Sequence, residues 1–305
     1  MNTMRQIGVL LCCALVAGGC SREPGSRVLT KGELTVQVDE AVSPVMTLVV
    51  DEFQRQYPEA KITIRPAEAR EVIANFASDS TRVIVCGREL NKEEKDALVA
   101  AKVQYQEYRV AMSAVTVIAH KDNPRKEVRT GQLDSMFSGM TTRWSGRRVI
   151  DLAVGGINSS TNETFRSRIL HGRPFAVSAT PYGSSRELVE HVRKTPGALG
   201  IVNLAWLKGV TQEISVVSLG TPGVAPDSTE PPGKFYSPAQ AYLYQGYYPV
   251  NSPVFIYARE VPSDLATGFI SFVASPPGQR VFLNSGLVPQ TQPVRLVQLT
   301  SDQVK

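Results

Sequence analysis

Two acidic residues stand where a predicted strand gives way to a predicted helix. The segment V-Q-V-D-E-A-V-S-P at 36–44 alternates apolar and polar residues and then places Asp39 and Glu40 before Ser43 and Pro44, which favour a helix start. A helix start presents unpaired backbone N–H groups and the positive end of the helix dipole, so it attracts anions. Two interpretations follow: the carboxylates cap the helix, or one of them faces a cleft and selects a ligand that carries an amine or a cation.

Hydroxyl groups gather at a second predicted helix start. Ser159, Ser160 and Thr161 stand together, and Ser160 with Glu163 forms the S-x-x-E pattern of a capping box. A serine at this place could also act as a nucleophile. However, the chain has no G-x-S-x-G turn, and its three histidines lack the spacing of a catalytic base. We therefore expect ligand binding here, with no catalytic residue, and not an enzyme.

The histidines and cysteines do not indicate a metal site or a cofactor. His120, His171 and His191 are widely separated and lack metal-ligand spacing. Cys86 lies in an apolar strand segment and is expected to be a buried, inert thiol. The net charge of +5 is spread over a mixed-sign sequence without a Lys/Arg tract, so nothing indicates nucleic-acid binding.

The N-terminal residues predict export and attachment to lipid. Residues 1–19 contain one cation, Arg5, and an apolar run too short to span a bilayer, which is typical of a signal peptide. Two glycines then precede Cys20, as in the lipobox of bacterial lipoproteins, so Cys20 is the expected site of lipidation. An ordinary cleaved signal with an incidental Cys20 is the alternative. Residues 20–30 are polar and are expected to form a tether between lipid and domain.

The length of the chain predicts two domains, and the order of elements predicts an α/β fold with parallel pairing. Two extended runs within 105–119 are expected to lead into the second domain, and a later strand is expected to return from it. We assign lobe 1 to 31–108 and 247–305, and lobe 2 to 109–246. Two such crossovers leave a cleft between the lobes, where small ligands bind.

Eight segments resemble, in their order, landmarks of one protein family. They are F-Q-R-Q-Y-P at 53–58, R-E-L at 88–90, A-H-K-D-N-P at 119–124, Q-L-D-S-M-F-S-G at 132–139, S-S-T-N-E-T-F at 159–165, P-G-A-L-G-I-V at 196–202, Y-Y-P-V at 247–250 and G-Q-R-V-F-L-N-S-G-L-V-P at 278–289. The chain resembles the PstS-like, phosphate-binding solute-binding proteins that feed bacterial ABC importers. The resemblance implies a two-lobed periplasmic-binding-protein fold (type II, Venus-flytrap), with mixed, mostly parallel sheets and a hinge of two crossovers.

The resemblance also implies a binding site, with local departures. Family members hold phosphate with a hydroxyl-bearing turn at the first helix start, an acidic acceptor, an arginine, and a Ser-Gly-Thr turn at a second-lobe helix. Here acidic residues take the place of the first hydroxyls, a basic residue stands near the position of the acidic acceptor, and the arginine before the second turn is missing. The expected ligand-binding residues are Asp39, Glu40, Ala41, Arg82, Arg88, Ser159, Ser160 and Thr161.

These departures leave two functions open. The resemblance implies a receptor on the periplasmic side of the bacterial cell envelope that passes phosphate or another oxyanion to an ABC permease, and we expect it to be a monomer anchored through lipid at Cys20. The acidic residues in the site favour instead an amine-bearing solute. A carboxylate beside bound phosphate costs several kcal/mol, so tight phosphate binding requires Arg82 and Arg88 both to face the ligand. The alternative is a stand-alone envelope lipoprotein that acts as a sensor or scaffold with a degenerate cleft.

Overall fold

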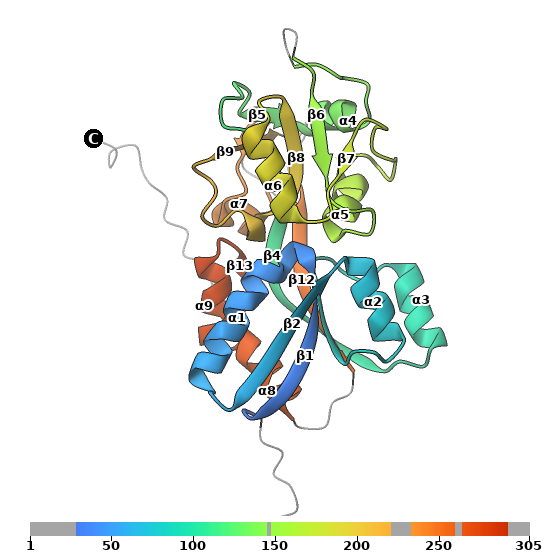
Figure 1. Ribbon diagram of the computed structural model, residues 1–305, viewed down its shortest axis with the longest axis vertical. Coiled ribbons are helices and arrows are strands. Elements are labelled where there is room, and N and C mark those ends of the chain that lie inside the picture. The colour runs from blue at the N-terminus through green and yellow to red at the C-terminus, as the bar shows by residue number, and fades with distance from the viewer. Residues whose placement is uncertain (1–28, 145–147, 221–232, 260–263, 292–305) are drawn as a thin grey trace, which may run out of the picture.

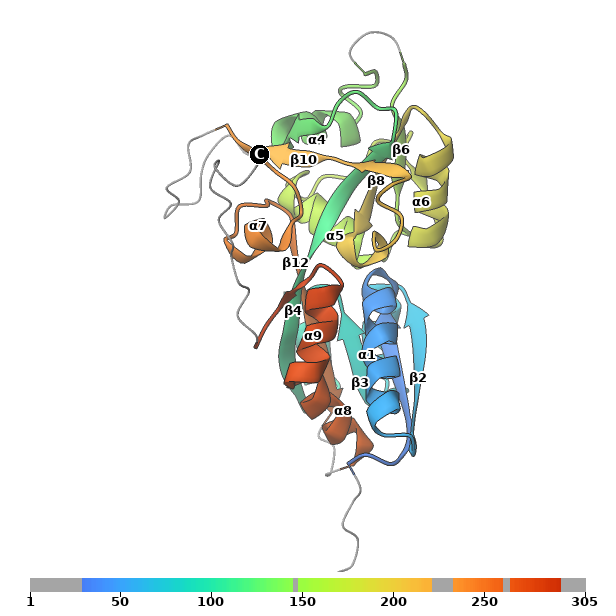
Figure 2. The same cartoon turned by 90° about the vertical axis from the view of Figure 1, so that its left-hand side faces the viewer.

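Two lobes lie one above the other along the longest axis of the molecule (Figures 1 and 2). The computed structural model describes residues 29–144, 148–220, 233–259 and 264–291, so the predicted signal peptide and Cys20 lie outside the described residues. None of the helices in the described ranges is both long enough and apolar enough to cross a membrane.

Lobe 1 is a sheet with helices packed on both of its faces. The strand order is β2-β1-β3-β12-β4, in which β1 pairs in parallel with β2 and β3, and β12 (Asn251–Arg259) is antiparallel to β3 and β4 (Tyr105–His120). Strand β3 reads V-I-V-C without alternation because its side chains enter two different cores. Its Cys86 is a buried free thiol, as predicted. The other elements of lobe 1 are β1 (Gly32–Asp39), η1 (Glu40–Val42), α1 (Ser43–Gln56), β2 (Ala60–Ala67), α2 (Ala69–Ala77), β3 (Val83–Cys86), α3 (Lys92–Ala100), α8 (Leu265–Ala274), α9 (Pro276–Asn284) and β13 (Val288–Pro289).

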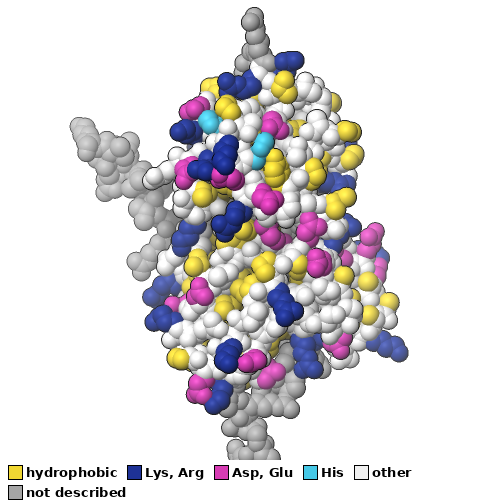
Figure 3. All heavy atoms as spheres, in the orientation of Figure 1, with side chains coloured by type: hydrophobic (Ala, Val, Ile, Leu, Met, Phe, Trp, Pro, Cys, Tyr) yellow, Lys and Arg dark blue, Asp and Glu magenta, His cyan; other side chains and the backbone are white. Residues whose placement is uncertain are grey.

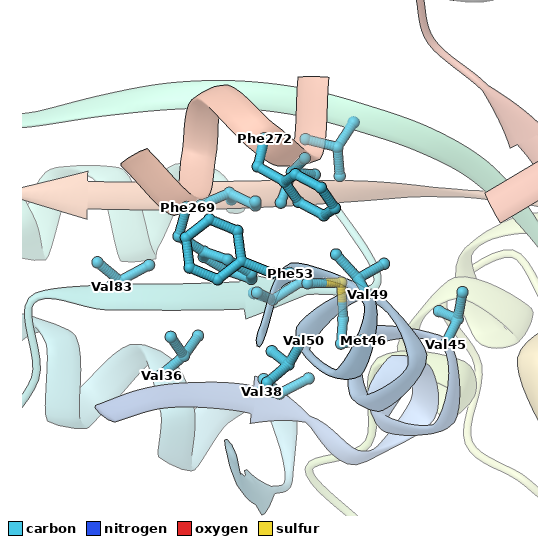
Figure 4. Close-up of a cluster of buried hydrophobic side chains, with 14 of the residues drawn as sticks. Val36, Val38, Val45, Met46, Val49, Val50, Phe53, Val83, Phe269 and Phe272 are labelled. Carbon is cyan, nitrogen blue, oxygen red and sulfur yellow. The ribbon is translucent and has the colours of Figure 1, made fainter. Parts of the chain in front are cut away.

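The core of lobe 1 fixes the element that carries the acidic pair. Helix α1 buries Met46, Val49 and Phe53 at helical spacing, and Figure 4 shows Phe53 facing the two phenylalanines of α8. The Phe53 ring centroid lies 5.5 Å from that of Phe269 and 5.2 Å from that of Phe272. Each large side chain buried in this way contributes about 1.5–3 kcal/mol. The packing of α1 against α8 therefore fixes the position of the turn between β1 and α1.

Lobe 2 is built around the second half of β4. That half is antiparallel to β8 and β9. Strand β6 pairs in parallel with β8 on one side and with β7 on the other. A small separate sheet has the order β11-β10-β5. The elements of lobe 2 are β5 (Glu127–Arg129), α4 (Thr130–Phe137), β6 (Asp151–Val154), α5 (Ser160–Arg168), β7 (Thr180–Pro181), α6 (Ser185–Lys194), β8 (Ala198–Asn203), η2 (Leu204–Trp206), β9 (Ile214–Val216), β10 (Ser218–Gly220), β11 (Phe235–Tyr236) and α7 (Gln240–Tyr244).

Strands β4 (Tyr105–His120) and β12 (Asn251–Arg259) form the two connections between the lobes. From Tyr105 to Ala114, β4 pairs with β12, and from Val115 onward it pairs with β8. The two extended runs expected within 105–119 are thus one continuous strand, which serves both sheets. Parallel pairs lie away from these connections, and the pairs made by the connections themselves are antiparallel.

Candidate functional site

The ends of lobe 1 strands meet the starts of lobe 2 helices around one small chamber. Because β1 and β3 are parallel, their carboxyl ends lie at the same edge of the sheet, and α5 and α6 begin opposite that edge. The chamber has a volume of about 20 Å³, which is room for one water molecule. It is lined by Asp39, Glu40, Glu68, Gly155, Gly156, Ser159, Thr161, Tyr182, Gly183, Ser184, Ser185 and Ile201.

Asp39 caps the turn that follows β1. Its Oδ1 accepts a hydrogen bond from the backbone N–H of Ala41 at 3.1 Å, and its Oδ2 accepts one from Gly87 at 2.9 Å. Asp39 is 1% exposed, and this burial raises the pKa of its carboxyl group. The nearby Ser160 hydroxyl, the two backbone donors and the charge of Arg88 act in the opposite direction without overcoming the burial. Asp39 thus caps the 3-10 turn η1, to which Ala41 belongs. The expected cap of α1 is wrong, because the N-cap residue of α1 is Val42, which makes no side-chain capping bond.

Glu40 crosses the cleft and binds the start of α6. Its Oε1 accepts from the backbone N–H of Ser185, and its Oε2 accepts from the Ser185 hydroxyl, both at 2.8 Å. Burial is the main reason that the pKa of Glu40 is raised; the Ser185 bonds lower it, and the negative charges of Asp39 and Glu68 raise it. The carboxylate therefore caps a helix, but that helix belongs to the other lobe.

Glu68 makes a second contact of this kind. It immediately precedes α2, and its Oε2 accepts from the backbone N–H of Asn158 in lobe 2 at 3.3 Å. Its Oε1 lies so close to Gly156 that a Cβ on that glycine would come within 1.6 Å of it. Position 156 therefore admits no side chain while Glu68 keeps this place. Glu68 was not among the expected site residues, because an acidic residue before a helix is also typical of a solvated helix end.

Four charged residues form a separate group, the ionic cluster, which also joins the lobes. The guanidinium of Arg88 donates to both carboxylate oxygens of Glu94, at 2.6 and 2.8 Å, and forms an ion pair with Glu163 of α5. Arg70 of α2 approaches the same Glu163 at 2.5 Å. Arg88 is buried, and both of its ion-pair partners are carboxylates outside the chamber. Arg88, expected to bind the ligand, is thus paired with Glu94 and Glu163.

Arg82 does not reach the cleft. It is an exposed residue immediately before β3, whereas Gly87, which contacts Asp39, follows the end of that strand. Five extended residues separate the two positions by roughly 16 Å. Arg82 was expected in the binding site because it is close to Arg88 in the sequence. Strand β3 lies between the two arginines and carries Arg82 to the far edge of the sheet.

In the hydroxyl turn at 159–161, Ser159 and Thr161 line the chamber, and Ser160 is buried beside Asp39. Ser159 is the N-cap residue of α5 and makes no side-chain capping bond, so the capping box expected for Ser160 and Glu163 is not formed. Glu163 is instead held by the ionic cluster. Thr161 is 3% exposed and lines the chamber, and its Oγ1 has no hydrogen-bond partner among the described residues.

A larger pocket of about 510 Å³ opens beside the chamber, between α1 of lobe 1 and α6 of lobe 2. The indole of Trp206 lines it, donates from Nε1 to the backbone oxygen of Glu40 at 3.0 Å, and lies under the guanidinium of Arg186. Sequence reasoning did not find this pocket, because its walls come together only when the lobes dock. Figure 3 shows acidic and basic side chains interspersed over both lobes on this face.

No group of three or more His, Cys, Asp or Glu side chains in the described ranges is arranged to hold a metal ion. The polar groups of the chamber are carboxylates, hydroxyls and backbone N–H groups at helix starts. Such groups suit hydrogen-bonded recognition of a small polar solute.

Residues 26–277 match the family model described as "PBP superfamily domain". The chain belongs to the PBP superfamily. Protein SphX of Synechococcus elongatus is 25% identical over 306 residues, which cover 94% of this chain and 86% of SphX. The phosphate-binding protein PstS of Staphylococcus haemolyticus is 21% identical over 82% of this chain and 78% of its own length. A Clostridium perfringens protein described as a phosphate ABC transporter substrate-binding protein with bound phosphate superposes with a TM-score of 0.73, at 20% identity, over 85% of this chain and 100% of that one.

These relatives confirm the PstS-like resemblance and the two-lobed periplasmic-binding-protein fold. The family consists of substrate-binding transport proteins and not of enzymes. The chamber therefore lies between the two lobes of a solute-binding fold.

Proposed function

We propose that this chain is an extracytoplasmic, PstS-like solute-binding protein that takes phosphate or another small solute between its lobes for ABC-type import. The observation that carries the proposal is the chamber, where helix starts of lobe 2 and strand ends of lobe 1 face each other. Both lobes contribute residues to the chamber and to the neighbouring pocket of about 510 Å³, so a solute held between the lobes stabilises their closed arrangement. In this proposal Asp39, Glu40, Ala41, Arg88 and Ser159 to Thr161 form or support the cleft.

Charge decides which solutes suit the cleft. Three carboxylates line the chamber, and the two nearest arginines are bound to Glu163. A phosphate dianion about 5 Å from one uncompensated carboxylate is disfavoured by several kcal/mol at an effective dielectric constant of about 20. The site therefore favours a neutral or amine-bearing solute over phosphate, and the neighbouring pocket of about 510 Å³ is within the usual range for small-molecule sites.

The proposal also includes the envelope location. The chain would be exported by a signal peptide at 1–19, lipidated at Cys20, and held by the tether at 20–30 on the periplasmic side as a monomer. Radiolabelled palmitate in cells should label the wild-type chain, and a Cys20→Ala variant should lose the label and appear in the soluble fraction.

Thermal shift and calorimetry test the binding proposal. Phosphate, sulfate, amino acids, polyamines and short peptides are added to the purified protein one at a time. A solute at 100 times its Kd stabilises the folded protein by about 2.7 kcal/mol, which raises Tm by several degrees. If no compound changes Tm or releases heat, transport of a cleft solute is contradicted.

The second candidate is a stand-alone sensor or scaffold. The observation that favours it is the small chamber, whose helix starts already carry Glu40 and Glu68. Genes for a permease and an ATPase beside this gene, together with co-purification of that permease, would exclude this candidate.

A further inference from the structure

The start of α6 already binds an anion, and that anion belongs to the opposite lobe. Ser185 is the first residue of α6 and donates from N and from Oγ to the two oxygens of Glu40. Helix starts bind phosphate and carboxylate ligands through the same groups. The backbone of Glu40 is held in place by Trp206, so the side chain projects from a fixed point.

The start of α5 repeats the arrangement. Asn158 lies just before α5, and its backbone N–H donates to Glu68 of lobe 1. Gly156 leaves the space that the Glu68 carboxylate fills. Thr161 adds a buried hydroxyl without a partner in the described part of the chain, and it lines the same chamber. Two carboxylates of lobe 1 thus stand where a solute that bridges the lobes would place its oxygens.

We propose that Glu40 and Glu68 are internal ligands that set the specificity of the cleft: their carboxylates occupy the helix starts that would otherwise receive an oxyanion, so the wild-type cleft rejects phosphate. This inference rests on the proposed solute-binding function and specifies it further. Removal of both carboxylates leaves the donors of Ser185, Asn158 and Thr161 facing an enlarged chamber with two fewer negative charges. The chamber then becomes an oxyanion site.

The test is isothermal titration of inorganic phosphate into the wild-type protein and into the double variant E40A/E68A at pH 7. We expect the double variant to bind phosphate at least about tenfold more tightly, which corresponds to about 1.4 kcal/mol. The matched control is E71A/E187A, which removes two charges from exposed residues in the first turns of α2 and α6 and leaves both contacts in place. An absent gain in E40A/E68A, or an equal gain in the control, overturns the proposal.

A third variant separates loss of the contact from loss of the charge. Ser185→Pro removes both donors to Glu40 at a first helical position where proline is tolerated, and the preceding Ser184 is already extended. It should leave phosphate affinity at the wild-type level, because it keeps both carboxylates and removes the donors at the start of α6. A gain like that of E40A/E68A would contradict the proposal. If the double variant fails to fold, Glu40→Gln keeps the shape and removes one charge, and it should still bind phosphate more tightly than the wild type.

Two failures remain distinguishable. If no solute binds the wild-type protein but E40A/E68A gains phosphate, the proposed function fails and this inference stands. If a solute binds the wild-type protein and E40A/E68A gains no phosphate, this inference alone fails.

Discussion

The two groups of contacts that join the lobes differ in their charge balance. The ionic cluster contains two arginines and two glutamates, so its charges cancel. The chamber brings three carboxylates together, and they face hydroxyls and backbone N–H groups instead of cations. The first group is a balanced ionic connection, whereas the second resembles the recognition of an anion by helix starts. Helix starts with the geometry of an anion site can therefore bind carboxylates of the same chain.

The largest effect should come from the ionic cluster. In Arg88→Met the carboxylates of Glu94 and Glu163 lose the buried cation that both of them contact. Breaking such a pair leaves uncompensated charge, and we expect a loss of about 3 kcal/mol in the free energy of unfolding, measured by urea denaturation. Arg82→Met is the control, because this exposed residue lies at the far edge of the sheet; it should change stability by less than about 0.5 kcal/mol. Equal losses in the two variants would show that the cluster has no special role.

Some features of the site could be predicted from the sequence, and the helix starts are the clearest of them. Local patterns placed two helix starts correctly, because α1 begins at Ser43, directly before Pro44, and α5 begins at Ser160. These features depend on a few neighbouring residues, which the sequence displays directly.

Contacts between the lobes could not be predicted in this way. Glu40 and Ser185 are 145 residues apart, and their contact exists only after both lobes have folded and docked. Glu40 was expected at the site, either as the cap of its own helix or facing the cleft; it caps a helix of the other lobe. Arg82 was misplaced because chain distance says little about which edge of a sheet a residue reaches.

A smaller effect should appear in the pH dependence of the chamber. The folded protein holds the Glu40 proton more tightly than the unfolded chain, because burial raises the pKa above the ordinary value of 4.5. This contribution to stability is full below 4.5 and is lost as pH rises through the raised value. The stability of the wild type relative to Glu40→Gln should therefore fall as pH rises above 4.5.

Urea denaturation of both proteins at several pH values measures this difference. Each unit by which the folded-state pKa is raised corresponds to about 1.4 kcal/mol. Asp39 contributes in the same direction and is present in both proteins; its charge also raises the pKa of Glu40, and this coupling is part of the measured difference. A difference that is constant with pH, or that grows in favour of the wild type, would contradict the assignment of Glu40 as a partly buried, desolvated carboxylate.

The smallest effect should come from Gly156→Ala. The new Cβ would overlap the Glu68 carboxylate, which is the mobile end of a flexible side chain. We therefore expect the carboxylate to leave Asn158 at a stability cost below about 1 kcal/mol. In Glu68→Ala the same alanine should cost less still, and a double-mutant cycle measures this coupling. Purely additive effects would show that Glu68 does not occupy this place in solution.

The decisive measurement of whether Glu40 and Glu68 join the lobes is small-angle X-ray scattering of the purified protein without added solute. If Glu40 and Glu68 hold the lobes together, the wild type should give the scattering curve of the compact arrangement, and E40A/E68A should give a larger radius of gyration. A wild type that is already extended, or a double variant as compact as the wild type, would contradict the account.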